Sequence, residues 1–461
     1  MPKPAGVELE KLLRVIRASR PLPEAGGGLL FASNFEGYVK TYRLGGPGGE
    51  PRLVADAGDR TLPHAETELG LLLRHDHGGD ERWQLSLLRP DGSLRALTHD
   101  PLAVHQSVSL HPDRRRAGLG WNPGGRGDVA LGELDLASGD QIEWTTPGGF
   151  WVWGDWSPDG RRAVVLKSFG SLTEAYLLER DGRLTRVLPE ARRVREPRWR
   201  DDGLYLLTDA GDRDFVGLAL VDPEQPREVA HRLFDDNHDV EGYVIDHASR
   251  RAALVVNDGF YDTLQIVELP SGAALDVAKW APGVVIHDHS GDQGYHVTWS
   301  HDDRSLFAAW ERPTSPAEIH EWPAGKRWTA VAADQQPADL VEPVEFTYQS
   351  FDGLPIQCLL YAVDDRPRPA VVNFHGGPEG QSRGEYVPQV HFMNRVGVNV
   401  LRPNVRGSTG YGWRFQSLDD KALRWDSVRD GCEAARQLKR AGLATRVAAM
   451  GASYGGFMTL A

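Results

Sequence analysis

Short apolar stretches alternate with polar turns through the first three quarters of the chain. The clearest turn, Trp156–Arg161, is followed by the apolar stretch Ala163–Leu166, a polar loop and a second apolar stretch, Ala175–Leu178. Short apolar runs that are bounded by Gly, Pro and Asp are typical of β-strands. The pattern therefore predicts a succession of short strands, and the Gly and Pro residues at the turns exclude a helical repeat.

This turn recurs at a nearly constant spacing. Trp156–Arg161 has a close copy at Trp299–Arg304, and the aligned turn residues at positions 113, 159, 202, 249 and 302 are separated by 46, 43, 47 and 53 residues. Similar backward steps reach Glu66 and Glu24, each of which precedes a further apolar strand. Four short strands in a period of this length are typical of a β-propeller. We predict a seven-bladed propeller, with the Trp before the turn packed between neighbouring blades.

The pattern changes after Pro337, where longer apolar strands alternate with helices. Ala370–Phe374 and Gly397–Leu401 are predicted strands, residues 421–440 form an amphipathic helix, and Val447–Met450 is a further strand. Strands that alternate with helices build a parallel, doubly wound sheet. This part of the chain is therefore predicted to adopt an α/β-hydrolase fold.

Three parts are expected along the chain. Residues 1–20 carry apolar residues at helical spacing among charges, and we expect a helical segment that packs on the hydrolase domain. Residues 21–335 form the all-β propeller. Residues 336–461 form the N-terminal part of the α/β-hydrolase domain, truncated after the segment described next.

Ser453 is the candidate nucleophile. It lies in Gly451–Gly456, where a predicted strand runs directly into an apolar segment. A Gly-x-Ser-x-Gly pattern alone is weak evidence, because chance matches occur easily in a glycine-rich chain. Its position indicates a nucleophile elbow, in which flanking glycines avoid clashes in a strained turn. The alternative is a glycine turn at a helix start without chemistry.

A second motif, His375–Pro378, follows the strand Ala370–Phe374. The Gly pair allows the backbone to approach a substrate carbonyl, so the N–H of Gly377 is a candidate donor to the oxyanion hole. The N–H of Tyr454 is the second candidate, and the ring of His375 is a third. His375 is poorly placed to be the general base, which follows the Ser in this fold.

These motifs resemble those of the prolyl oligopeptidase family, closest to its acylaminoacyl-peptidase-like branch. The resemblance covers nearly the whole chain and rests on His375–Pro378, Asn404–Gly412, Trp425, Asp430 and Gly451–Gly456. It implies a serine peptidase that cleaves short peptides through an acyl-enzyme on Ser453, with the propeller limiting substrate size. Acylaminoacyl-peptidase, endo-oligopeptidase, dipeptidyl-peptidase and carboxypeptidase-like activities all occur in the family. No acidic pair that would anchor a free amino terminus is evident in the propeller, which disfavours the dipeptidyl mode.

The triad of this family runs Ser, Asp, His along the chain, and no Asp or His follows Ser453 before Ala461. An unassisted Ser hydroxyl is a weak nucleophile, so we expect this chain alone to be inactive. A separate C-terminal fragment that completes the site is left open, as are an esterase of the same fold, an inactive propeller-based binding module and a homo-oligomer.

Composition and charge limit which binding partners and which cellular location are expected. A net charge of -13 argues against nucleic acid and against an anionic membrane surface. Two cysteines make no disulfide framework, and without a signal peptide or a long apolar segment the cytoplasm is the expected location. His75 with His77, and His287 with His289, could each bind one metal ion, but neither pair has a third ligand nearby. No metal and no cofactor is therefore expected.

Overall fold

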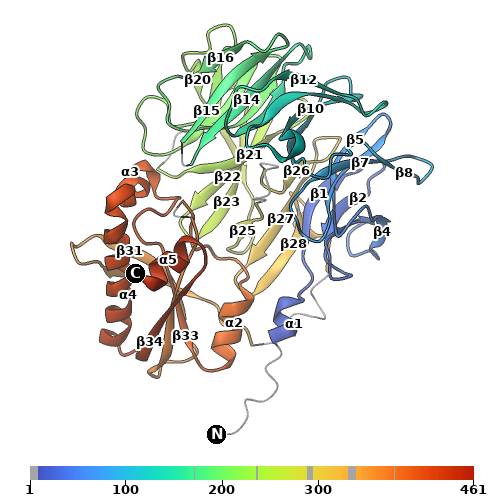
Figure 1. The fold of residues 1–461 in the computed structure, drawn as a ribbon. Coiled ribbons are helices and arrows are strands. Elements are labelled where there is room, and N and C mark those ends of the chain that lie inside the picture. Colours follow the sequence, from blue (N-terminus) through green and yellow to red (C-terminus); the bar gives the residue numbers. More distant parts are fainter. Residues whose placement is uncertain (1–8, 171, 235–236, 288–293, 331–338, 378) are drawn as a thin grey trace.

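Seven small antiparallel sheets follow one another in the described part of the chain, each built from consecutive strands (Figure 1). The computed structural model describes residues 9–461 except 171, 235–236, 288–293, 331–338 and 378. First strands of neighbouring sheets contact each other, as β9 contacts β13 and β13 contacts β17, so they line the centre of the ring. The predicted seven-bladed propeller is confirmed.

Blades one to four contain four strands each. They are β1 (Ala18–Pro23), β2 (Leu29–Ser33), β3 (Lys40–Leu44) and β4 (Arg52–Ala55); β5 (Arg60–Thr67), β6 (Gly70–Asp76), β7 (Gln84–Leu88) and β8 (Leu94–Ala96); β9 (His105–Leu110), β10 (Arg116–Trp121), β11 (Ala130–Asp135) and β12 (Gln141–Thr145); β13 (Trp151–Trp156), β14 (Arg162–Phe169), β15 (Leu172–Glu179) and β16 (Leu184–Val187). A short 3-10 turn, η1 (Pro123–Gly125), lies between β10 and β11.

Blades five to seven complete the ring. They are β17 (Val194–Arg200), β18 (Gly203–Thr208), β19 (Gly217–Val221) and β20 (His231–Arg232); β21 (Val240–Ile245), β22 (Arg251–Asp258), β23 (Tyr261–Glu268) and β24 (Ala274–Val277); β25 (Val284–Val285), β26 (Val297–Trp299), β27 (Leu306–Arg312), β28 (Ser315–Trp322) and β29 (Lys326–Arg327). In the last blade both β25 and β26 pair with β27.

The repeated Trp packs against the preceding blade, as predicted. Trp156 Nε1 donates a hydrogen bond to the main-chain oxygen of Ser109 at 3.1 Å, and Trp299 Nε1 donates to that of Val244 at 3.2 Å. The first bond joins β13 of blade four to β9 of blade three, and the second joins β26 of blade seven to β21 of blade six. The repeat in the sequence thus marks the contact between blades as well as the turn within one.

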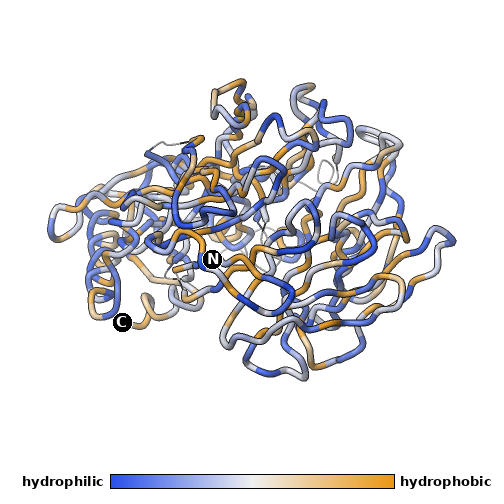
Figure 2. Tube along the Cα trace, turned by 90° about the horizontal axis from the view of Figure 1, so that it is seen from above, coloured by the Kyte–Doolittle hydropathy of each residue, from blue (hydrophilic) through white to orange (hydrophobic). Residues whose placement is uncertain are grey.

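Apolar cores lie between successive blades, because each sheet buries both faces. The ring closes in the same way, where Leu29 and Phe31 of blade one share a core with Phe307, Ile319 and Trp328 of blade seven. Each sheet takes all its strands from one stretch of chain, so closure depends on side-chain packing. Seen from above, hydrophobic and hydrophilic stretches alternate along the chain trace (Figure 2).

The remaining sheet belongs to the hydrolase domain and has the strand order β30-β31-β33-β32-β34. β32, β33 and β34 are parallel, whereas β31 is antiparallel to both β30 and β33. The strands are β30 (Val344–Gln349), β31 (Pro355–Tyr361), β32 (Arg368–Phe374), β33 (Asn399–Pro403) and β34 (Ala444–Gly451).

Helices cover both faces of this sheet, which confirms the predicted doubly wound arrangement. On one face, Leu438 of α4 (Arg424–Arg440) and Met458 of α5 (Tyr454–Leu460) share a core with Phe374 of β32. On the other face, Val390 of α2 (Pro388–Arg395) packs with Val400 of β33. The short helices α3 (Gly412–Gln416), η2 (Ser417–Asp419) and η3 (Lys421–Leu423) join β33 to α4.

The N-terminal helix α1 (Leu9–Leu13) lies beside α2. Tyr386 Oη donates a hydrogen bond to the main-chain oxygen of Leu12 at 3.5 Å, and Val15 packs against the same ring. The first strand of the propeller follows at Ala18, so this segment connects the two domains. No helix in the described ranges is long and apolar enough to cross a membrane.

Candidate active site

Ser453 occupies a sharp turn between β34 and α5. The strand ends at Gly451, the helix begins at Tyr454, and Ser453 itself is exposed. Its backbone has φ 54° and ψ −121°, an unfavourable conformation for a residue with a side chain. A strand, a strained turn and a helix in direct succession are the geometry of a nucleophile elbow.

Two flanking glycines allow α5 to start close to the sheet. A Cβ atom on Gly455 would lie 2.4 Å from the main-chain oxygen of Phe374, and one on Gly451 would lie 2.4 Å from the carbonyl carbon of Gly455. Both distances are far shorter than normal contacts between these atoms. The glycine spacing of the motif is therefore explained by the close approach of helix and strand.

The loop after β32 runs directly beside Ser453. A Cβ atom built on Gly376 would lie 3.7 Å from Ser453 Cβ, and Gly377 has φ 127°, a region that glycine tolerates. On the other side of the turn, the N–H of Tyr454 belongs to the first turn of α5 and has no intrahelical acceptor. The backbone of Gly376 and the start of α5 thus both lie close to Ser453, while Pro378 lies outside the described residues.

Both ring nitrogens of His375 have hydrogen-bond partners other than Ser453. Nε2 lies 2.8 Å from Ser408 Oγ, and Nδ1 lies 2.7 Å from the main-chain oxygen of Gly376. Burial lowers the pKa of this ring below its ordinary value. A direct role of His375 as an oxyanion donor stays a prediction, because its ring would have to leave these two partners.

The described residues give Ser453 Oγ no side-chain partner. Within the described ranges, no side chain forms a hydrogen bond with Ser453 Oγ, and residues 454–461 contain neither Asp nor His.

A cavity of about 560 Å³ lies between the propeller and the hydrolase domain. Its hydrolase side includes Glu379 and Gly380, which directly follow the loop beside Ser453. Arg383 forms an ion pair with Asp262, and Arg195 lies 3.8 Å from Glu241. Three further lining carboxylates pair with arginines outside the lining, namely Glu196 with Arg198, Glu311 with Arg17 and Glu385 with Arg402. The charged lining residues are Glu196, Glu241, Asp262, Glu311, Glu379, Glu385, Arg195 and Arg383.

Sequence reasoning did not find this acidic lining. Glu196 comes from blade five, Glu241 from blade six and Glu311 from blade seven, whereas Glu379 comes from the hydrolase domain. No local pattern connects residues so far apart in the chain. The nearest sequence signal for this lining was the stretch after Pro378. It continues the loop that runs beside Ser453, so it is well placed to line the cavity.

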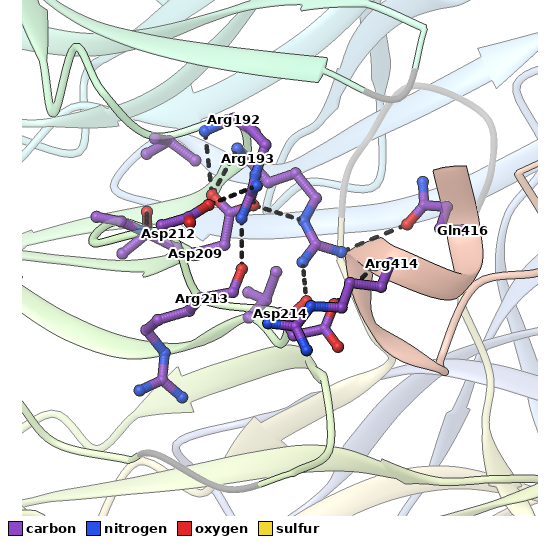
Figure 3. A network of polar contacts seen from close by, with 12 residues as sticks. Arg192, Arg193, Asp209, Asp212, Arg213, Asp214, Arg414 and Gln416 are labelled. Atoms are coloured by element: carbon purple, nitrogen blue, oxygen red, sulfur yellow. Dashed lines mark hydrogen bonds and ion pairs between the residues drawn. The ribbon is translucent and has the colours of Figure 1, made fainter. Parts of the chain in front are cut away.

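A polar network docks helix α3 on blade five (Figure 3). Asp214, in the loop between β18 and β19, accepts hydrogen bonds from the N–H of Trp413 and, through Oδ1, from the N–H of Arg414, both at 2.7 Å. Arg193 Nη1 donates to Gln416 Oε1 at 3.4 Å, and its guanidinium lies 5.7 Å from the ring centre of Trp413. This contact holds the two domains together on one side of the cavity.

Comparisons with known proteins agree with a seven-bladed propeller joined to an α/β-hydrolase domain. Residues 386–461 match the family model described as "Prolyl oligopeptidase family". The match confirms the predicted resemblance to this family over that part of the chain.

Named relatives include peptidases of two kinds. The chain is 24% identical to dipeptidyl aminopeptidase BIII of Pseudoxanthomonas mexicana, over 85% of this chain and 59% of that protein. It is 33% identical to acylamino-acid-releasing enzyme 1 of Oryza sativa subsp. japonica, over 28% of this chain and 18% of that protein. The chain thus spans less than two thirds of the length of these relatives.

Solved structures show the same fold. A puromycin-hydrolyzing peptidase of Mycobacterium tuberculosis superposes with a TM-score of 0.78, over 100% of this chain and 77% of that one, at 18% sequence identity. A structure described as a puromycin hydrolase gives a TM-score of 0.77 at 22% identity. At these identities the likeness establishes the architecture of both domains together.

Proposed function

We propose that the complete protein is a cytoplasmic serine peptidase that cleaves short peptides, and that Ser453 is its nucleophile. The observation that carries this proposal is the strained turn at Ser453, which lies beside the backbone of Gly376 and at the start of α5. In this mechanism the N–H groups of Gly377 and Tyr454 bind the oxyanion that forms when Ser453 attacks the scissile carbonyl. Its collapse expels the amine and leaves an acyl-enzyme, which water then hydrolyses.

The general base of this mechanism is not supplied by the residues that follow Ser453 in the 461-residue sequence. We therefore expect the chain by itself to have little activity, and the triad Asp and His to come from another segment or chain. The cavity supports the limit on substrate size, because about 560 Å³ accommodates a few residues of extended peptide but no folded domain.

The amino end of the substrate is either N-acylated or free. The resemblance favours an N-acylated amino acid, which is neutral at that end. A dipeptidyl aminopeptidase among the relatives favours a substrate with a free, positively charged amino group. Glu379, a lining carboxylate without an ion pair among the described residues, is available to bind such a group. An esterase has no comparable support, since a propeller that screens peptides by size has no evident use for small esters.

Labelling with a fluorophosphonate probe, followed by intact mass measurement, tests the nucleophile. One adduct that maps to Ser453 is expected in the complete protein and none in its Ser453→Ala variant. The 461-residue chain should remain unlabelled, and an adduct there would contradict its predicted inactivity. If the complete protein takes no adduct at Ser453, the proposed function is wrong.

Substrate comparison on the complete protein separates the remaining alternatives. An N-acyl amino-acid anilide, the matched anilide with a free amino group and a simple acyl ester are compared by kcat/KM. Preference for the first supports acylaminoacyl-peptidase activity, and preference for the second supports an aminopeptidase mode. Hydrolysis of the ester alone would indicate an esterase.

A further inference from the structure

Tyr454, the residue after the candidate nucleophile, is anchored by a carboxylate from another part of the hydrolase domain. Its hydroxyl donates a hydrogen bond to Asp419 Oδ2 at 2.9 Å. Asp419 is the last residue of η2, 35 positions earlier in the chain, and it is 5% exposed. The anchored residue is the one whose N–H is proposed to face the oxyanion.

Space for this carboxylate is created by a glycine. Gly407 has φ 95°, and a Cβ atom at this position would lie 2.2 Å from Asp419 Cγ. Any side chain at position 407 would therefore displace Asp419 from Tyr454. Burial raises the pKa of Tyr454 to about 12, so its hydroxyl keeps the proton that it donates at neutral pH. Gly407 thus makes room for the hydrogen bond between Asp419 and Tyr454.

Asp419 is also connected to the propeller. η2 follows directly after α3, and α3 is docked on Asp214 of blade five through the N–H groups of Trp413 and Arg414 (Figure 3). Gly412 makes this docking close, because a Cβ atom there would lie 2.8 Å from Asp214 Cγ. A continuous path of contacts therefore runs from blade five through α3 and Asp419 to Tyr454.

We propose that Asp419 is a positioning residue for the oxyanion hole and that it makes the geometry at Tyr454 depend on the docking of α3 on blade five. This proposal rests on the proposed function of Ser453 and Tyr454. Its physical basis is that a backbone donor must be held in place before the reaction, and that the strained turn at Ser453 persists only while its surroundings hold it. Loss of the Asp419 contact frees the ring of Tyr454 and relaxes the first turn of α5.

A double-mutant cycle on the complete protein tests the contact. Asp419→Ala and Tyr454→Phe should each lower kcat about tenfold and leave KM within about twofold, because they act on a group used in the transition state. The double variant should be no slower than the slower single variant. Asp419→Asn retains an oxygen acceptor and should restore most of kcat. Additive losses, or changes confined to KM, would overturn the proposal.

Docking on blade five is tested in the same assay. Asp214→Ala removes the acceptor of the Arg414 N–H and should lower kcat severalfold, with no further loss in the Asp419→Ala background. Asp201→Ala is the matched control, because Asp201 is an exposed acidic residue in the turn between β17 and β18 of the same blade and has no hydrogen bond or ion pair to α3 among the described residues. Equal effects of the two loop variants would contradict the coupling.

Amide hydrogen exchange separates this proposal from the proposed function. In Asp419→Ala and Asp214→Ala the amides of residues 454–457 should exchange faster than in the unmodified protein, and in Asp201→Ala they should not. This result requires no turnover, so it stands even if the complete protein fails to hydrolyse any peptide. Unchanged exchange in Asp419→Ala would overturn the positioning role whatever the activity.

Discussion

Arg406 and Asp430 form a two-armed ion pair between the loop after β33 and helix α4. Arg406 Nη2 lies 2.8 Å from Asp430 Oδ1, and Nε lies 2.9 Å from Oδ2. Asp430 is fully buried, and Arg406 is 5% exposed. The pair fixes the segment that starts at Gly407. Gly407 lies beside Asp419, and Ser408 forms a hydrogen bond with His375. Two motif residues that the sequence singled out therefore act together as a brace beside the candidate site.

Removal of one partner of this pair should destabilise the hydrolase domain strongly. Arg406→Ala leaves the buried Asp430 carboxylate without its cation, which is expected to cost about 4 kcal/mol in the free energy of unfolding. Asp426→Ala is the control on the same helix, since Asp426 pairs with the exposed Arg429 and should cost less than about 1 kcal/mol. Urea denaturation measures both, and similar midpoints for the two variants would contradict the bracing role.

Neighbouring glycines in the elbow should respond differently to a methyl group. Gly455→Ala places a Cβ 2.4 Å from the main-chain oxygen of Phe374 and should displace α5 from β32. In Gly456→Ala the nearest atom is 3.7 Å away, an ordinary contact, so the variant should be neutral or slightly stabilising. Fluorophosphonate labelling of the complete protein should be lost in the first variant and kept in the second. Loss in both would show that the argument from space is wrong.

Glu311 should make the protein less stable as the pH rises from 4 to 8, which is opposite to the usual effect of a carboxyl group. This side chain is 3% exposed, and burial raises its pKa from 4.5 to about 7. The folded state therefore holds the proton more tightly than the unfolded state, so stability from this group is present below pH 4.5 and is lost as the pH rises to 7.

Relative to Glu311→Gln, the unmodified protein should lose roughly 3 kcal/mol of unfolding free energy between pH 4 and pH 8. Glu342→Gln, an exposed residue, serves as the control. Thermal unfolding of the three proteins across this range measures the effect. Parallel pH profiles for the unmodified protein and Glu311→Gln would contradict it.

Ring closure of the propeller should depend on Trp328. Its ring packs edge-on against Phe307 with centroids 5.3 Å apart and joins the core shared with blade one. Trp328→Ala should cost about 4 kcal/mol, because a large buried side chain leaves a cavity. Leu275→Ala on the outer strand of blade six, where Leu275 is 52% exposed, should cost less than about 1 kcal/mol. Comparable losses in both variants would argue against closure by packing.

Local patterns explain why so much of the fold was predictable. The turn around Asp159 recurs because every blade needs the same tight connection between its first two strands, so the period of the repeat counts the blades. The elbow at Ser453 was visible because a strand end, a small flanking residue and a helix start are adjacent in the chain. The bounds of Gly397–Leu401, which the structure places at Asn399–Pro403, shifted because the apolar pattern does not show which residues pair.

The sequence by itself determined the number of blades, the hydrolase architecture and the position of Ser453, because each depends on residues that are neighbours along the chain. Only the tertiary structure decided which side chains meet across the domains. The engaged ring of His375, the acidic lining of the cavity, the anchor from Asp419 to Tyr454 and the docking on Asp214 all join residues that are distant in sequence. Such contacts are set by how the blades and the sheet pack, and no local pattern encodes that packing.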